Sequence, residues 1–167
     1  MSAVISLAQN AGDIYGGYSQ EVAKNISYFL PIDSATASKL TNPFTLPISG
    51  NIYSYEIYLR CRCDLAPENF CSNFKVWYNS GLPINGQKIT VNNDIINTYT
   101  APKNIESVRG TRDEFINYTD VDNSISLDGD LINVGDYTSW LVFQLELSAG
   151  ADTGSFELEY TIQYDEV

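Results

Sequence analysis

Apolar and polar residues alternate along most of this chain after Asn51, and a period of two residues is that of a β-strand. Between Tyr53 and Cys63 the odd positions hold apolar or thiol side chains, and the even positions hold Ser, Glu, Tyr and Arg. This pattern predicts a strand with one face on a core and the other in water. The same period predicts further strands in residues 73–79, 88–91, 139–147 and 156–164.

Turn signals separate these strands at short spacing. Asn85-Gly86 precedes the strand at 88–91, and residues 124–134 predict a hairpin that turns at Asp128-Gly129. No helical pattern of 10–15 residues intervenes. Seven to nine such strands predict an all-β fold, an antiparallel β-sandwich of jelly-roll type.

Residues 1–50 are different. Residues 4–9 predict one short strand, but Pro31, Pro43 and Pro47 then punctuate a stretch rich in Ser and Thr, which favours an extended conformation. We therefore expect an N-terminal arm over residues 1–50 and a sandwich domain over residues 51–167. The arm either wraps its own subunit or lies on a neighbour.

The composition fits one globular domain without catalytic machinery. The chain has 167 residues, 44% of them hydrophobic, and its 12 tyrosines favour strands. Histidine is absent, which removes the usual general base near neutral pH and the commonest zinc ligand. Two carboxylates suffice for a glycosidase, but no pair stands out, and no nucleophile elbow, P-loop or dinucleotide fingerprint occurs. The sequence predicts a protein that is not an enzyme and has no cofactor.

The charge is strongly negative and unevenly distributed. The net charge is -12, and residues 113–167 contain thirteen acids and no Lys or Arg. Such a surface disfavours nucleic acid and anionic membranes as partners. No apolar run approaches the roughly 18 residues of a membrane span. The first 17 residues lack the basic start of a signal peptide, so we expect the chain to be made in the cytoplasm without export.

The three cysteines lie close together in the sequence. Cys61 and Cys63 share the apolar face of one predicted strand and are expected to be reduced core residues. Cys71 differs in parity from Phe74, which places it on the opposite face unless a bulge shifts the register. A disulfide between Cys63 and Cys71 and a metal site stay open as alternatives, although C-x-C is not the usual zinc spacing.

The acidic stretch 120–130 superficially resembles a calcium loop. Ile125 stands where an EF-hand has its turn glycine, and the twelfth position is not acidic. We therefore expect no metal site, and interpret these acids as residues that serve the turns of a polar hairpin, with calcium held by irregular loop oxygens as the alternative. The weak calcium candidates are Asp120, Asp122, Asp128 and Asp130.

Two arginines and several aromatic side chains lie opposite the apolar sets of their strands. Arg60 and Arg62 fall on the face opposite the cysteines, where acids of a neighbouring strand or subunit would pair with them. Tyr58, Trp77 and Trp140 either pack inside the sandwich or serve an interface. The interface candidates are Arg60, Arg62, Trp77 and Trp140.

Several segments resemble a known family. "NPFTLPISGNIYSYEIYLRCRC", "NFKVWYNSG", "YTSWLVFQLEL" and the terminal "IQYDEV" are similar to small β-sandwich virion proteins from the structural modules of tailed bacterial and archaeal viruses. The resemblance covers about two-thirds of the chain, from residue 43 onward. It implies a structural protein of the virion, as a capsid decoration or tail component. It also implies a symmetric homo-oligomer, with a trimer as the expected number, that contacts other virion proteins.

A carbohydrate-binding module is the alternative function. Trp77, Tyr78 or Trp140 would then stack on sugar rings, with calcium assisting through the aspartates of residues 120–130. A glycan would in that case be the partner.

Overall fold

A computed structural model describes residues 2–12, 20–23, 27–37, 40–81, 83–154 and 156–167. These residues form ten β-strands and one short 3-10 helix, and every strand pairing is antiparallel. Two sheets pack on each other around one core, so the predicted all-β sandwich is confirmed. The jelly-roll connectivity and the contact role of the N-terminal arm stay predictions.

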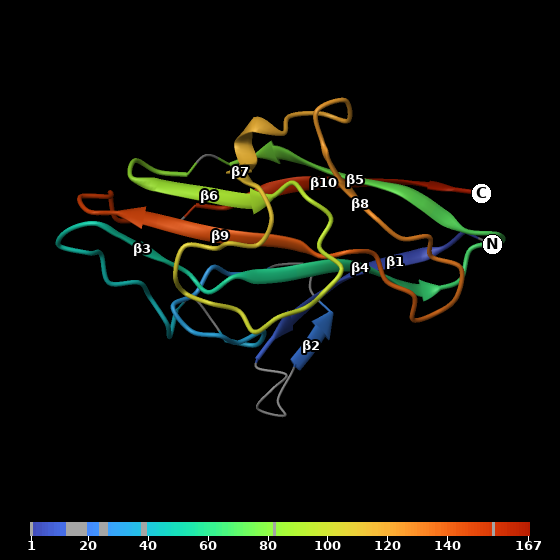
Figure 1. The fold of residues 1–167 in the computed structure, drawn as a ribbon, viewed down its shortest axis with the longest axis horizontal. Coiled ribbons are helices and arrows are strands. Elements are labelled where there is room, and N and C mark those ends of the chain that lie inside the picture. Colours follow the sequence, from blue (N-terminus) through green and yellow to red (C-terminus); the bar gives the residue numbers. More distant parts are fainter. Residues whose placement is uncertain (1, 13–19, 24–26, 38–39, 82, 155) are drawn as a thin grey trace.

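Sheet A contains seven strands in the order β2-β1-β4-β9-β6-β7, with β3 also paired to β9. Their bounds are β1 (Val4–Ala11), β2 (Gln20–Ala23), β3 (Asn51–Tyr53), β4 (Ile57–Leu65), β6 (Gln87–Asn92), β7 (Arg112–Glu114) and β9 (Leu141–Ser148). Sheet B has the order β10-β5-β8. Its strands are β5 (Cys71–Ser80), β8 (Ile125–Leu127) and β10 (Glu159–Glu166), and the 3-10 helix η1 is Phe115–Asn117. Both chain ends lie at the same end of the sandwich (Figure 1).

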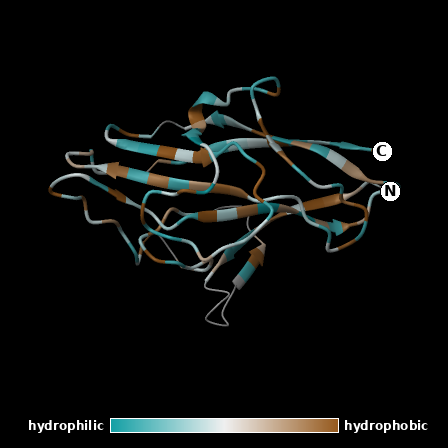
Figure 2. Cartoon of the chain, viewed as in Figure 1, coloured by the Kyte–Doolittle hydropathy of each residue, from teal (hydrophilic) through white to brown (hydrophobic). Residues whose placement is uncertain are grey.

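The core lies between the two sheets, where the period-two pattern places it. Leu59 and Cys61 of β4 face Phe74 and Val76 of β5, and Phe115 of η1 packs edge-on against the ring of β9 Phe143. Figure 2 shows the resulting alternation of hydrophobic and hydrophilic positions along the strands. The strand pattern read from the sequence therefore specifies the core well.

The first part of the N-terminal segment is built into sheet A. β1 pairs with β4 in the register Ile5↔Cys63 and Gln9↔Leu59. The described residues between 27 and 50 form no helix or strand, and Phe44 packs against the core of its own subunit. Residues 4–11 and 20–23 therefore belong structurally to the sandwich, and the extended part follows them.

The predicted hairpin at Asp128-Gly129 is wrong. β8 pairs with β5, and Leu131 makes an isolated bridge with Cys71 further along the same strand, so the chain does not turn back. Leu131 is completely buried, and this apolar contact holds the chain on sheet B. Gly129 instead lies where the backbone of Tyr137 and Thr138 comes close to it. Its φ is +122°, and a Cβ there would lie 3.1 Å from the carbonyl oxygen of Tyr137.

A bulge at Asn73 overturns the parity argument for Cys71. Asn73 has a φ of +53°, and the β5–β10 register shifts between Gln163 and Asp165, beside it. Cys71 consequently points into the core. All three cysteines are free and buried, and burial raises the pKa of Cys61 to about 12. A neutral, buried thiol is a poor nucleophile.

Candidate functional site

The outer face of sheet A is covered by residues 93–111, which we name the strap. It crosses in front of β4 and β9 (Figure 1). Two backbone hydrogen bonds join it to the residues that precede these strands: the N–H of Glu56 donates to the carbonyl oxygen of Lys103, and the N–H of Trp140 donates to that of Ile96. The face of residues 53–63 that the alternation predicts to be wet is therefore buried at Glu56 and Tyr58. That expectation is corrected: water is excluded because the strap forms a third layer.

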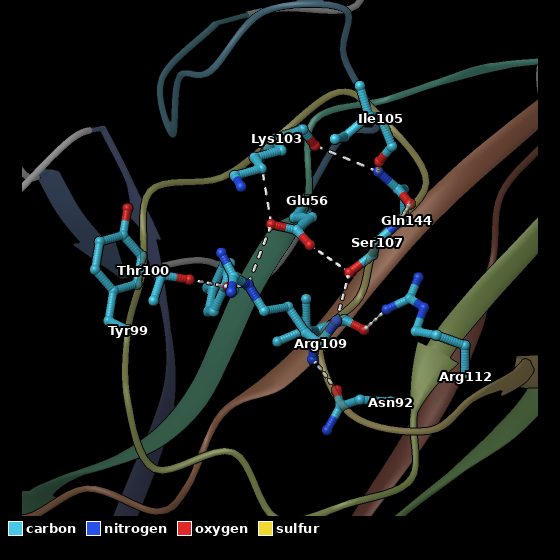
Figure 3. Close-up of polar contacts among 12 residues, drawn as sticks. Glu56, Asn92, Tyr99, Thr100, Lys103, Ile105, Ser107, Arg109, Arg112 and Gln144 are labelled. Carbon is cyan, nitrogen blue, oxygen red and sulfur yellow. Dashed lines mark hydrogen bonds and ion pairs between the residues drawn. The ribbon is translucent and has the colours of Figure 1, made fainter.

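Glu56 anchors the strap from the residue before β4. Its backbone N–H donates to the carbonyl oxygen of Lys103 over 3.1 Å, and its Oε2 accepts from the N–H of Lys103 over 3.2 Å. Its Oε1 accepts a hydrogen bond from the Ser107 hydroxyl, and Nε of Arg109 lies 3.9 Å from Oε2 (Figure 3). The buried carboxylate is thus held by hydrogen bonds and a nearby cation.

Gln144 holds the strap from β9, the central strand beneath it. Its Nε2 donates to the carbonyl oxygens of Ser54 (3.0 Å) and Ile105 (2.8 Å), and its Oε1 accepts from the N–H of Ser107 (2.9 Å). Ser107 therefore bonds Gln144 through its N–H and Glu56 through its hydroxyl. These bonds from two directions fix the strap at Ser107.

An aromatic cluster fixes the other half of the strap. The rings of Tyr58 and Tyr99 meet edge-on with centroids 5.0 Å apart, and Trp140 lies 5.8 Å from Tyr58. The Tyr58 hydroxyl accepts from Nε of Arg109 over 2.9 Å and shares a 2.9 Å hydrogen bond with Thr100. Trp140 is therefore buried by its own subunit and offers no platform for a sugar.

Arg112 closes the strap where β7 begins. Its Nη1 donates to the carbonyl oxygen of Val142 over 3.0 Å, and its Nη2 donates to the Thr90 hydroxyl. Burial lowers the pKa of Arg112 to about 10, which still leaves it charged at neutral pH. The guanidinium is a structural clamp between β7, β6 and β9.

The outer surface of the strap is apolar at its centre. Ile105 is 60% exposed and Val108 is 77% exposed, on either side of the buried Ser107. Charged residues of both signs belong to the same segment: Asp94, Lys103, Glu106 and Arg109. We regard this surface as the candidate functional site, because a rigid exposed apolar surface is suited to protein contacts.

Arg60 is paired within its own subunit. Its Nη2 lies 2.6 Å from Oε2 of Glu21 on β2, and its guanidinium carbon lies 3.5 Å from the Tyr137 ring centroid and 4.1 Å from that of Trp140. The Tyr137 hydroxyl donates to the same glutamate over 2.8 Å. The acid comes from two strands away in sheet A, and the cluster ties β2 to the sheet.

The other two interface candidates, Arg62 and Trp77, keep part of their surface exposed. Arg62 forms ion pairs with Asp64 (3.2 Å) and Glu21 (3.8 Å). Trp77 of sheet B pairs with Thr161 of β10, follows the buried Val76 and is partly buried, in contact with the edge of the core. The four candidates therefore do not form one site, since Trp77 is on the far sheet and Trp140 is covered.

The four calcium candidates do not converge. Asp120 Oδ1 accepts hydrogen bonds from the backbone N–H groups of Asp122 and Asn123, and β8 separates this turn from Asp128 and Asp130. The described part of the chain holds no group of three or more His, Cys, Asp or Glu residues able to bind a metal ion. Asp120 accordingly serves as a turn residue.

Sequence reasoning missed Glu56, Ser107 and Gln144. One signal was available in "WLVFQLEL", where Gln144 lies among apolar residues of both parities. A strand that is apolar on both faces is covered on both faces, and a glutamine inside it needs buried partners. No comparable signal marks Ser107, which a loop of ordinary polar composition surrounds.

No family model, curated protein or solved structure matches this chain. Among the described residues, no helix has the length and apolar character needed to cross a membrane.

Proposed function

We propose that this chain is a non-enzymatic structural protein of a virion, a capsid decoration or tail component that assembles as a symmetric homo-oligomer through the strap. The supporting observation is the pair Ile105 and Val108, which project from a segment held at Ser107 by Glu56 and Gln144. The resemblance of the strand segments to virion sandwich proteins supplies the virion part of the proposal.

The strap suits a repeated contact for two physical reasons. Its backbone is already fixed, so association loses little conformational entropy on this side of an interface. Its charged residues have both signs, so Lys103 of one copy can pair with Glu106 of another across a symmetry axis. The two aliphatic side chains then supply the apolar centre of the interface.

The experiment is a native mass measurement by light scattering on the full chain. We expect the wild type to be an oligomer, with a trimer as the expected number. The double variant Ile105→Asp/Val108→Asp should be a monomer with an unchanged circular dichroism spectrum. Ile48→Asp is the matched control, because Ile48 is fully exposed outside the strap. A monomeric wild type, or a double variant of unchanged mass, contradicts assembly through the strap. Immunogold labelling of virus particles tests the virion location separately.

The carbohydrate-binding alternative now rests on Trp77 alone. Trp140 is buried, and Tyr78 points inward to an edge-on contact with Phe115, with ring centroids 6.4 Å apart. Trp77 of β5 keeps part of its surface exposed, although it also packs against the core. Retention on a glycan array that Trp77→Ala removes would favour this function. Retention that persists in Trp77→Ala, or is absent in the wild type, argues against it.

A further inference from the structure

Both chain ends lie at one end of the sandwich (Figure 1), and segments that meet there expose aliphatic side chains, which form a second apolar surface. Five aliphatic side chains there are between 37% and 61% exposed. We name them the terminal patch: Val4, Leu65, Ile132, Val134 and Val167.

Hydrogen bonds bring the sheet A part of the terminal patch together. Val4 is the partner of Leu65 in the β1–β4 register. On the other side of β4, the N–H of Gly135 donates to the carbonyl oxygen of Cys63 over 2.8 Å, which places Val134 beside the end of the same strand. Three segments that are distant in sequence thus expose aliphatic side chains at one edge.

The sheet B part is assembled in the same way around Phe70. Leu131 and Cys71 exchange two backbone hydrogen bonds of 2.9 Å, so Ile132 comes next to Phe70. On the other side, Val167 donates to the carbonyl oxygen of Phe70 over 3.0 Å and accepts from its N–H over 3.3 Å. Ile132 and Val167 therefore flank Phe70, and Asn133 links this row to Val134.

The rim of the terminal patch is acidic. Ser2, Glu68, Glu166 and Val167 line one open hollow. Hydrogen bonds from Ser2 and Ala3 lower the pKa of Glu166, so it is charged at neutral pH. The cation Arg62 has its charge taken up by Glu21 and Asp64. The acids within three residues of a patch residue in the chain are Asp64, Glu68, Asp130, Asp136, Asp165 and Glu166.

We infer that the terminal patch docks a different protein, one whose apolar contact is surrounded by Lys and Arg. An apolar centre with a charged rim is typical of a protein interface. A second copy seated on the same patch would oppose two acidic rims, and like charges across an interface cost several kcal/mol. A basic rim on the partner turns the same charges into attraction. The inference does not depend on the strap, because the two surfaces share no residue.

The test uses a fluorescent amphipathic peptide of Leu and Lys and its Leu and Glu counterpart, with anisotropy as the readout on the full chain. We expect only the Lys peptide to bind. Ile132→Ser with Val134→Ser should weaken its binding by about tenfold or more. Glu68→Gln with Asp130→Asn should weaken it at low ionic strength and much less at about 0.5 M salt. Ile48→Ser with Asp152→Asn is the control and should bind as the wild type does.

The outcomes that overturn the inference are specific. Equal weakening in the control pair, or unchanged binding in the Ile132 and Val134 variant, means that the peptide follows the overall charge of -12 and not the patch. Binding of the Glu peptide overturns the inference, because the acidic rim then does not select a partner with Lys and Arg. A wild-type oligomer that the two serine substitutions dissociate identifies a second copy as the occupant. The strap variant Ile105→Asp/Val108→Asp should still bind the Lys peptide. Loss of assembly through the strap can therefore be told apart from loss of docking on the terminal patch.

Discussion

At the scale of single residues, buried polar side chains organise the outer layer of this sandwich. Gln144 and Glu56 lie beneath the strap, where water does not compete for their hydrogen bonds. In such a place a satisfied network specifies one conformation, and a missing partner costs more than the bond contributes. The position of Ile105 and Val108 therefore depends on residues that make no outside contact themselves.

The substitution Gln144→Leu tests this dependence. It leaves the N–H of Ser107 and the carbonyl oxygen of Ile105 buried without their partner, and each unsatisfied group costs about 1–3 kcal/mol. We expect the free energy of unfolding in urea to fall by about 3 kcal/mol. Gln163→Leu, at an exposed position of β10, is the control and should change it by less than about 0.5 kcal/mol. Equal losses of stability for the two substitutions would show that the hydrogen-bond network around Gln144 does not stabilise the fold.

At the scale of elements, the period of a strand predicts which of its residues face the core, but not whether another segment covers its other face. The alternation from Tyr53 to Cys63 correctly places Cys61 and Cys63 in the core. It fails for Glu56, because the strap buries this second face, and the strap residue Lys103 that bonds Glu56 lies 47 residues further along the chain. The period also does not reveal irregularities inside a strand. One extra residue at Asn73 reverses the alternation, so Cys71 points into the core and not to the opposite face.

The bulge itself is open to test at Asn73, whose φ of +53° lies in the left-handed region. A β-branched side chain is poorly accommodated there, so Asn73→Val should lower the free energy of unfolding by about 1–2 kcal/mol. It also removes the 2.9 Å hydrogen bond from Nδ2 of Asn73 to Asp165. Asn73→Gly loses the same hydrogen bond but relieves the backbone, so it should be the milder change. Equal losses in urea denaturation would show that the hydrogen bond, and not the backbone conformation, matters.

At the scale of the whole molecule, the two proposed contact surfaces differ in charge. The strap has residues of both signs, whereas the terminal patch has an acidic rim. Composition alone does not show where the thirteen acids of residues 113–167 gather on the surface. The fold places several of them around the apolar terminal patch. A surface of mixed sign suits contacts between copies, and a surface of one sign suits a different partner.

The same charge makes the pH dependence of stability a balance of two opposing effects. Hydrogen bonds from the backbone N–H groups of Asn133 and Ile132 lower the pKa of Asp136 below its usual 3.8, and the bond from Thr111 does the same for Asp94. A carboxyl whose folded pKa is depressed stabilises the fold above its usual pKa, and this contribution is lost as the pH falls through the lowered value. Protonation of the other acids meanwhile reduces the repulsion that accompanies a net charge of -12, which favours the fold.

Asp136→Asn separates the two effects, because it keeps an oxygen that can accept both hydrogen bonds and removes the charge. We expect its melting temperature to lie below that of the wild type by a constant amount from neutral pH down to about pH 5. The difference should then shrink as the pH falls below 3.8, because Asp136 of the wild type becomes protonated as well. Glu157→Gln, at an exposed site next to β10, is the control, and its difference from the wild type should not follow this course. A difference for Asp136→Asn that stays constant as the pH falls below 3.8 would show that the charge of Asp136 does not stabilise the turn at residues 132–136.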